Sequence, residues 1–507
     1  MPNWALTAEP RWCRWSGLAG SLALAAGGQR SGALPRGPGA SLDGPPYLGG
    51  GVALTWFGVA LLTAAWLLLG RSVASGRTPP VASGRTPSVG WLCATLACWA
   101  APLLLAPPLF SRDVYSYLAQ GALLDAGLDV YTHGPADLGG PEADQVPEVW
   151  RHTPTPYGPL FLLLARAAHG WAGSDPVVGP IALRATALVG TLALVALLPR
   201  LARACRVAPQ TALWLGALNP LLLLHLVAGA HNEALLLPLL LGGLLAARRS
   251  PVLGAVLVTL AALVKVPAVL ALPAVWWLGH GRTGRRGGLL AGADAAFAVL
   301  VAAVATTVLV TAVSGTGFGW LDALGTPASA GSWSPVTAVG RLVARGFAEP
   351  DRVVTVARWA GSAVAAAVCA VLAHRVGTGR LGAVHATGLA LAAVVVLGPA
   401  VRPWYALWAV PLLAAAAGGT VRIRWWTAGA CAALAFSVFP DGWTPGGRAL
   451  GLAAAGVVTA LLVAAGAVLR PDRAVADVKQ PVDVEQPVKV EQAVGMPLVR
   501  AAGRAAR

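Results

Sequence analysis

The sequence predicts an all-α integral membrane protein, a polytopic helical bundle with about 14 membrane segments (range roughly 12 to 16). Three observations predict this fold class. Of the 507 residues, 56% are hydrophobic and only 11% are charged, whereas a soluble globular chain carries about a quarter charged residues. The mean hydropathy is +0.67. The apolar residues fall in many long runs separated by polar loops, as they do in membrane-spanning helices.

The chain is strongly basic, with 37 Lys and Arg against 21 Asp and Glu and a net charge of +16. In a soluble protein such a charge suggests nucleic acid as a partner. Here most arginines lie in short loops beside apolar runs, so the positive-inside rule explains the charge. We therefore predict the lipid bilayer as a partner and no nucleic acid. The six cysteines lie in or beside apolar runs without a CxxC pair, which predicts neither disulfides nor a metal site.

The N-terminal apolar stretch, from Arg11 to Gly28, fits either a signal peptide or a first membrane helix. We expect a helix, because no clean cleavage site follows. Two further runs, Gly50–Leu69 and Val89–Leu109, come next. Between them the loop 71–88 contains VASGRTP twice, which indicates a flexible cytoplasmic spacer.

The longest polar stretch of the membrane body is Phe110–Thr153, which holds seven carboxylates and two arginines. A loop so poor in arginine is expected on the extracytoplasmic side, and loops of this length tend to be functional. It contains a helix-like piece, Val114–Leu124. We predict a large first extracytoplasmic loop over about residues 110–175.

A charge argument places the next two apolar runs. Tyr157–Ala172 is short for a membrane span, opens with prolines and contains Arg166. We expect it to lie on the outer face as an interfacial helix. Pro176–Leu201 then crosses alone and leaves the cluster Arg200, Arg203 and Arg206 in the cytoplasm, as the positive-inside rule prefers.

The run Pro251–Leu278 poses a similar problem, because arginines both before and after it belong in the cytoplasm (Arg248 and Arg249; Arg282, Arg285 and Arg286). The run breaks naturally at Lys265-Val266-Pro267, since proline removes a backbone donor and clashes with the preceding turn. Each half is too short to cross the bilayer. We predict a helical hairpin with Lys265 at its outer apex; a single kinked helix is the alternative.

The remaining runs alternate across the membrane, with an outer loop at Ser314–Pro335. They are Leu289–Thr311, Val353–Ala373, Leu381–Gly398, Tyr405–Gly418, Trp425–Phe439 and Ala449–Leu469. The segment 470–507 repeats short polar units and is expected to be a disordered tail. We thus predict a polytopic membrane domain over residues 1–469, with both termini in the cytoplasm.

Polar residues gather at the outer ends of the predicted helices. Ionisable groups at membrane depth are unfavourable, so each is a functional candidate. A few carboxylates among several cations predict a site for a phosphate-bearing lipid together with one base. The candidates are Arg112, Asp113, Arg184, His231, Asn232, Glu233, Lys265 and Arg402, with Tyr157, Trp404 and Tyr405 beside them.

Several of these residues also allow structural interpretations. Asp113 could cap a helix that begins at Val114. Arg184 and Arg402 could extend to lipid headgroups. His231 and Glu233 could pair with each other at a helix turn. His133 is expected to be a structural loop residue, because no second His or Cys lies at metal-ligand spacing.

Extended motifs in this chain resemble one family of membrane glycosyltransferases. The strings are FSRDVYSYLAQGALLDAGLDVYTHGP, TPYGPLFLLLARAAHG, GAHNEA, LVKVPAVLALPAVWW, GSWSP and VRPWYALW. They are similar to the polyprenol-phosphomannose-dependent α-1,6-mannosyltransferases of the GT-C class, which build lipomannan and lipoarabinomannan cores of the cell wall. The resemblance extends from about Gly17 to Leu469, so it leaves out the tail, and the repeat loop also departs from it.

The resemblance implies an inverting transfer of mannose from polyprenyl phosphomannose to an α-1,6-mannan acceptor, at the extracytoplasmic face of the plasma membrane. In this class an acidic residue of the first large loop acts on the acceptor, and Asp113 holds that position here. Arg184, Lys265 and Arg402 would stabilise the departing phosphate, and Glu233 is the reserve base. The resemblance implies no cofactor, since the lipid-linked donor is a substrate, and no required metal.

Two other functions remain open at this point. A relative of the same class could transfer another sugar, such as glucose or arabinofuranose, because a few hydrogen bonds set sugar identity. A lipid flippase or solute transporter would be expected to show internal repeats and binding residues near the midplane. The membrane body has no such repeat, and its polar candidates gather at one face.

Overall fold

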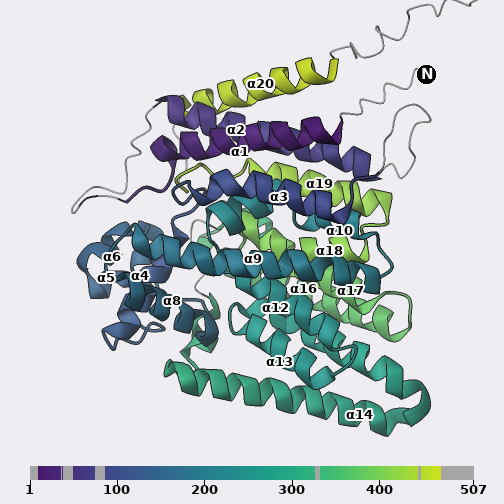
Figure 1. Cartoon of the computed structure of the whole chain (residues 1–507). Helices are drawn as coiled ribbons and strands as arrows, with labels where there is room; N and C mark the ends of the chain where they lie inside the picture. The colour runs from purple at the N-terminus through teal and green to yellow at the C-terminus, as the bar shows by residue number, and fades with distance from the viewer. Residues whose placement is uncertain are drawn as a thin grey trace, which may run out of the picture. The chain divides into compact units, whose positions relative to one another are not determined.

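The computed structural model describes residues 9–35, 37, 49–74, 86–325, 332–442 and 447–469. Every regular element within these ranges is a helix, as predicted (Figure 1). Most of the predicted repeat loop 71–88 and all of the predicted tail 470–507 lie outside the described residues.

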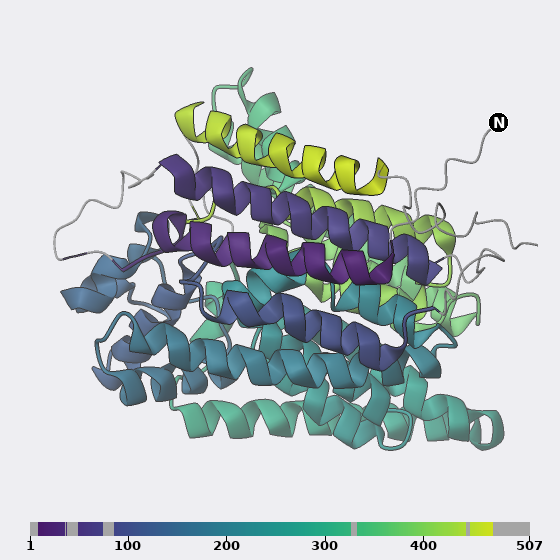
Figure 2. The same ribbon diagram turned by 45° about the horizontal axis from the view of Figure 1, so that its top comes forward.

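Small residues allow the first two helices to pack closely. These helices are α1 (Pro10–Ser31) and α2 (Gly49–Ala74), which lie side by side in Figures 1 and 2. A Cβ at Gly20 would lie 2.8 Å from the backbone nitrogen of Leu62. Such close backbone approach is typical of helix pairs in membranes. The expected N-terminal helix is therefore an integral part of the helical bundle.

Five helices in the described part of the chain are long and apolar enough to cross a membrane: Gly50–Val73, Val178–Ala204, Gly292–Ser314, Pro350–Gly377 and Gly447–Gly466. A pair bent by 52°, Pro209–Gly216 and Pro220–Ala228, makes a sixth candidate if it is one span. Seven other apolar helices have only 10–17 residues. The predicted count of about 14 segments is therefore not confirmed.

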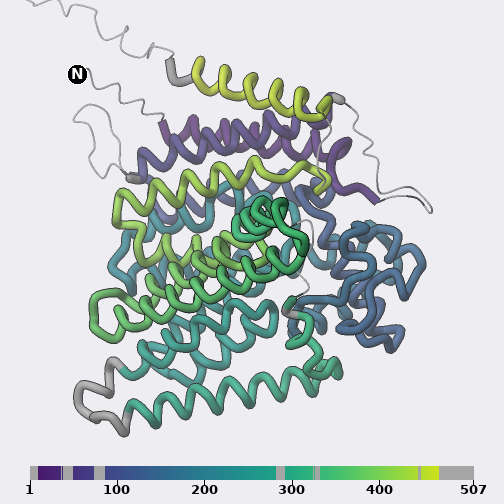
Figure 3. Tube along the Cα trace, turned by 180° about the vertical axis from the view of Figure 1, so that it is seen from behind, coloured from purple at the N-terminus to yellow at the C-terminus, as the bar shows by residue number. Residues whose placement is uncertain are grey.

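The acidic stretch folds into short helices beside one end of the long ones (Figure 3). The predicted helix Val114–Leu124 is confirmed, and the predicted helix Tyr157–Ala172 is confirmed from Pro159 onward. The elements are α4 (Asp113–Asp125), α5 (Pro135–Leu138), α6 (Gly140–Gln145), α7 (Glu148–Arg151) and α8 (Pro159–Ala172). They connect α3 (Val89–Leu104) to α9 (Val178–Ala204).

A polar network fastens α8 to α4 and α6. Asp125 accepts hydrogen bonds from Arg166 Nε at 2.8 Å and from the His169 ring at 2.7 Å. Glu142 bonds to His169 and to Ser174. Burial alone would raise the pKa of Asp125, but these hydrogen bonds outweigh burial and hold its pKa below the usual value. The network fixes the loop helices that carry the candidate base.

Breaks in the middle of the chain keep several helices short. The elements there are α10 (Pro209–Gly216), α11 (Pro220–Leu222), the π-helix η1 (Leu223–Ala228), α12 (Glu233–Ala246), α13 (Pro251–Ala262), the 3₁₀-helix η2 (Val266–Ala271) and α14 (Leu272–Ser314). Asn219 caps α11 by accepting from Leu222 N–H at 2.8 Å. Proline follows each of the breaks at Asn219 and Ser250, which starts a new helix there.

The predicted hairpin around Lys265 is confirmed. The chain leaves α13, breaks before η2 and returns alongside α13. Gly279 packs so closely on Pro251 that a Cβ there would lie 2.3 Å from Pro251 Cγ. The chain reverses again within α14, because Trp276 Nε1 donates to Gly292 O at 2.9 Å, whereas sixteen residues of straight helix span about 24 Å.

The C-terminal part follows the predicted order with one added helix. The elements are η3 (Gly319–Gly325), α15 (Pro335–Ala344), α16 (Pro350–Gly377), α17 (Ala383–Leu397), η4 (Pro403–Trp408), α18 (Val410–Ala416), α19 (Val421–Ala435) and α20 (Gly447–Leu469). The helix α15 was not predicted. The 3₁₀ turn η4 replaces the start of the predicted run Tyr405–Gly418.

Candidate active site

The candidate base Asp113 is the first residue of α4 and is 9% exposed. Just before it, Phe110 adopts a left-handed backbone conformation (φ 63°), which side-chain-bearing residues rarely adopt. The Phe110 N–H donates to Pro440 O at 2.7 Å. This tight connection turns the chain from α3 into α4 and directs Asp113 inward.

The structure argues against a capping role for Asp113. Arg112 is the N-cap residue of α4, and no helix N–H among the described residues donates to the Asp113 carboxylate. Instead, Asp113 Oδ2 lies 3.5 Å from His231 Nδ1. Burial raises the pKa of Asp113, while the positive charges of Arg402 and Lys265 act in the opposite direction. A buried carboxylate with a raised pKa is a stronger base than a solvated one.

His231 is held in an aromatic stack beneath Asp113. Its ring lies 4.1 Å from the Trp404 ring and 5.3 Å from the His225 ring, centroid to centroid. Its Nδ1 also lies 3.4 Å from Tyr117 Oη. The alternative that His231 pairs with Glu233 is therefore wrong. The next residue, Asn232, is buried, and its side-chain amide has no hydrogen-bond partner within the described ranges.

Glu233 and Lys265 form a buried ion pair. Lys265 Nζ lies 2.6 Å from Glu233 Oε1, and the Glu233 side chain is 0% exposed. Trp408 Nε1 donates to the same oxygen at 3.2 Å. Lys265 Nζ also lies over the ring of Tyr405, 4.4 Å from its centroid. The sequence predicted both residues near the site but did not predict that they pair.

The backbone break at Lys265 brings Tyr157 beside this pair. The Gly158 N–H donates to Val264 O at 3.3 Å, and Leu160 N–H donates to Leu263 O at 3.1 Å. A Cβ at Gly158 would lie 2.2 Å from Leu263 O, so only glycine permits this approach. Lys265 Nζ consequently lies 5.4 Å from the Tyr157 ring centroid.

Arg112 and Arg184 stabilise the chain connections around the site. Arg184 donates to Leu104 O at 3.1 Å, to Ala106 O at 2.6 Å and to Ala228 O at 2.9 Å. Arg112 donates to Leu34 O at 3.1 Å and to Gln145 O at 3.2 Å. Arg184 thus joins the end of α3 to η1 and does not extend to lipid headgroups. Neither arginine lines the pocket that contains Asp113.

Five of the predicted residues meet in one pocket: Asp113, Tyr157, Arg402, Trp404 and Tyr405. The same pocket is lined by residues that were not predicted: Ser116, Gln120, Trp150, Thr153, Pro154 and Pro156. The Arg402 guanidinium lies over the Trp150 ring, 5.2 Å from its centroid. The pocket therefore combines a buried base and a cation with aromatic walls. The helical spacing of Ser116 and Gln120 from Asp113 is the sequence signal that could have revealed these two residues.

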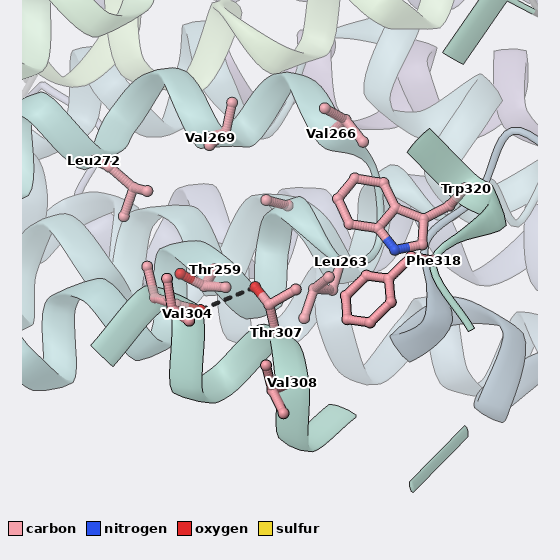
Figure 4. A pocket seen from close by; sticks show the side chains of 12 residues that line it. Thr259, Leu263, Val266, Val269, Leu272, Val304, Thr307, Val308, Phe318 and Trp320 are labelled. Carbon is pink, nitrogen blue, oxygen red and sulfur yellow. Dashed lines mark hydrogen bonds between the residues drawn. The ribbon is translucent and has the colours of Figure 1, made fainter. Parts of the chain in front are cut away.

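A second, apolar cavity lies beside the hairpin apex and has a volume of about 250 Å³ (Figure 4). Its walls come from α13, η2, the second half of α14 and the segment that follows α14, and include Leu263, Val266, Val304, Phe318 and Trp320. Leu263 and Val266 lie close to Lys265 in the sequence. The mainly apolar cavity therefore lies beside the hairpin apex that carries Lys265.

Comparisons with known proteins agree with the resemblance. Residues 14–281 match the family described as "Alpha-(1->6)-mannopyranosyltransferase, N-terminal domain", and residues 331–469 match the "MptB C-terminal domain". The chain is 38% identical over 379 residues to alpha-(1->6)-mannopyranosyltransferase A of Mycobacterium tuberculosis, covering 72% of this chain and 70% of that protein. It is 34% identical over 438 residues to alpha-(1->6)-mannopyranosyltransferase B of Corynebacterium glutamicum, covering 80% and 72%.

The two family matches together include every residue that lines the pocket: the first covers those from Asp113 to Tyr157, and the second covers Arg402, Trp404 and Tyr405. The family model alone spans more than half of the chain. The chain is a glycosyltransferase, and it belongs to the alpha-(1->6)-mannopyranosyltransferase family.

Proposed function

We propose that the protein transfers mannose from polyprenyl phosphomannose to the 6-hydroxyl of an α-1,6-mannan acceptor of a lipoglycan, with inversion at the anomeric carbon. The observation that carries this proposal is the buried Asp113 carboxylate, which shares an aromatic-walled pocket with Arg402. A sugar transferred from a phosphate ester needs one base for the acceptor and positive charge near the leaving group. The pocket supplies both.

In the proposed reaction Asp113 removes the proton from the acceptor 6-hydroxyl as that oxygen attacks the anomeric carbon of the β-linked donor. The bond between the anomeric carbon and the phosphate oxygen breaks on the opposite face, and its electron pair leaves with polyprenyl phosphate. The new bond is an α-1,6 linkage. Such a phosphate departs without a general acid when a cation stabilises its charge.

Arg402 is the cation best placed for the leaving phosphate, because it lines the pocket with Asp113. Lys265 is balanced by Glu233 at 2.6 Å, so its contribution is to position Tyr405 and Tyr157 at the pocket wall. The same pairing makes Glu233 a poor base. His231 contacts Asp113 and orients its carboxylate. Asn232, which follows His231 in the chain, is also buried.

The experiment that tests this function compares donors in proteoliposomes containing the purified protein and an α-1,6-mannobiose acceptor. We expect transfer from polyprenyl phosphomannose and none from GDP-mannose, because a lipid phosphate and not a nucleotide is the proposed leaving group. Polyprenyl phosphoglucose and polyprenyl phosphoarabinofuranose test the alternative sugars. Transfer from either of these, with none from the mannosyl donor, would contradict the proposal.

The pH dependence of transfer should report the charge around Asp113. Activity should fall as the pH drops through the pKa of Asp113, because protonation removes the base. In Arg402→Gln the positive charge that lowers this pKa is gone, so the pKa rises and the acid limb of kcat/KM moves to higher pH. The control is Arg422→Gln, at an exposed position at the start of α19, which should leave the limb in place. An unmoved limb in Arg402→Gln would show that Asp113 is not the titrating group.

We further propose that the isoprenoid chain of the donor lies in the apolar cavity beside the hairpin apex (Figure 4). Its lining is mainly hydrocarbon, with Thr259 and Thr307 among the apolar side chains. Val304 and Val308 are about half exposed, as expected for a surface that faces lipid chains. Filling the cavity with Val304→Trp should lower transfer from a long-chain donor and spare a donor with a short, water-soluble chain. Val356→Trp, at a similarly exposed position on α16, is the control. Equal loss with both donors would argue against a chain-binding role.

The membrane placement of this site is also a proposal. We place the pocket on the extracytoplasmic face of the plasma membrane, with both termini in the cytoplasm, because the segment from 110 to 153 is poor in arginine. About 14 membrane segments would then require most of the short apolar helices to enter the bilayer in broken pairs. The variant Asp129→Cys tests this orientation with a membrane-impermeant thiol reagent added to intact cells. Labelling is expected; a cysteine that the reagent does not reach would place the pocket on the cytoplasmic face.

A further inference from the structure

One face of α4 presents a row of polar side chains to the candidate pocket. Ser116 and Gln120 follow Asp113 by three and seven residues, and all three line the pocket. This spacing places them along one side of a helix. From Asp113, the helical rise is about 4.5 Å to Ser116 and about 10.5 Å to Gln120.

Both added side chains are buried without a partner. Ser116 is 4% exposed and Gln120 is 6% exposed, and among the described residues Ser116 Oγ and Gln120 Oε1 have no hydrogen-bond partner. Leaving such groups unpaired in a folded interior is unfavourable, and most buried polar groups are paired. Two of them beside the candidate base indicate that a polar ligand completes their hydrogen bonds.

The rest of the pocket limits the kind of ligand. Four aromatic side chains line it: Trp150, Tyr157, Trp404 and Tyr405. A pyranose has hydroxyl groups around its rim and C–H groups on its faces, so it can bond to a polar row while lying against aromatic rings. A pocket of aromatic walls with a few converging polar groups is typical of small-molecule sites.

We propose that Ser116 and Gln120 bind two successive sugars of the acceptor. This rests on the proposed function, in which the terminal mannose places its 6-hydroxyl at Asp113. Ser116 is one helical turn from Asp113, so it contacts a hydroxyl of that same sugar. Gln120 is farther away than the length of one pyranose ring, so its Oε1 accepts from a hydroxyl of the sugar before it. The enzyme therefore prefers an acceptor of at least two sugars.

Kinetics with two acceptors test this assignment. Polyprenyl phosphomannose is the donor, and the acceptors are methyl α-mannoside and the methyl glycoside of α-1,6-mannobiose. The wild type should have the lower KM for the disaccharide. Gln120→Leu should raise the disaccharide KM by roughly fivefold, as expected for one lost hydrogen bond, and should raise the monosaccharide KM by a smaller factor, so that the preference for the disaccharide is lost. Ser116→Ala should raise KM for both acceptors by a similar factor.

Controls separate a binding role from a structural one. Gln120→Asn keeps the amide but shortens its reach, so it should also lose the preference for the disaccharide. Gln210→Leu on α10, away from the pocket, should keep the preference. Because Gln120 Oε1 has no partner in the part of the chain that the structure describes, Gln120→Leu should not lower the melting temperature.

The outcomes also separate this inference from the proposed function. A Gln120→Leu enzyme that keeps the wild-type KM ratio, or loses affinity for both acceptors equally, would overturn the assignment of Gln120 while mannosyl transfer stands. A wild type that transfers to neither acceptor would overturn the proposed function, and this inference with it.

Discussion

Replacing Asp113 with asparagine should lower mannosyl transfer by about 10²- to 10⁴-fold, the range typical of a lost general base. Asparagine has nearly the same shape, so the pocket should persist. The variant should also fold at least as well as the wild type, because burial disfavours the charged carboxylate, as its raised pKa shows. The measurements are the rate of transfer in proteoliposomes and the melting temperature in detergent.

The matched control is Asp351→Asn, an exposed aspartate in the first turn of α16. It should keep both full activity and wild-type stability. If Asp113→Asn transferred mannose at the same rate as this control, Asp113 would not be the base. Attention would then move to Glu233, which could act only if its pairing with Lys265 opened.

Removing the lysine of the buried pair should be among the most destabilising single changes in the protein. In Lys265→Met, the Glu233 carboxylate, at a site with 0% exposure, loses the ammonium partner that lies 2.6 Å from it. Uncompensated buried charges of this kind cost about 3–5 kcal/mol of unfolding free energy. Unfolding in a detergent and denaturant series measures the loss.

A double variant distinguishes loss of the partner from loss of packing. Glu233→Gln combined with Lys265→Met removes both charges and should recover most of the stability. The exposed pair Arg352 and Glu349 is the comparison, because Arg352→Met there should change stability little. If the double variant were as unstable as Lys265→Met, the aromatic contacts of Lys265 would carry the stability, and the charge pairing would not.

Local sequence signals predicted much of the fold. The lysine-proline break at Lys265-Val266-Pro267 predicted the hairpin, because proline excludes a continuous helix and the arginine clusters required a reversal. The helix over Val114–Leu124 and the helix before Ala172 were also predicted. These features depend on a few neighbouring residues, which the sequence displays directly.

The number of membrane spans could not be predicted in the same way. Apolar composition alone does not distinguish a full span from a helix of 10–17 residues packed inside the bundle. Asn219 illustrates the difficulty: its cap ends one helix and starts another within a run of continuous apolar sequence. The pair is bent by 52° at this break, where Asn219 and Pro220 start the second helix, and an average hydropathy does not register such a break.

The sequence predicted many of the residues of the candidate site, but it did not predict which groups those residues contact. Asp113, Tyr157, Arg402, Trp404 and Tyr405 meet in one pocket, as expected of residues at neighbouring helix ends. Arg184, however, donates to Leu104 O on α3 and to Ala228 O on η1, which lie 80 and 44 residues away along the chain. Such contacts depend on tertiary packing. The sequence alone therefore does not distinguish an arginine that bonds to backbone carbonyls, such as Arg184, from one that lines the pocket, such as Arg402.

The most direct test of the central claim is the linkage formed by the purified protein from polyprenyl β-phosphomannose and an α-1,6-mannobiose acceptor. Proton NMR of the product measures the configuration of the new anomeric carbon and the oxygen to which it is attached. The account predicts a single new α-1,6 linkage, formed by the wild type and not by Asp113→Asn. A β-linked product, or an α-1,6 linkage formed equally well by both proteins, would contradict inverting transfer with Asp113 as the base.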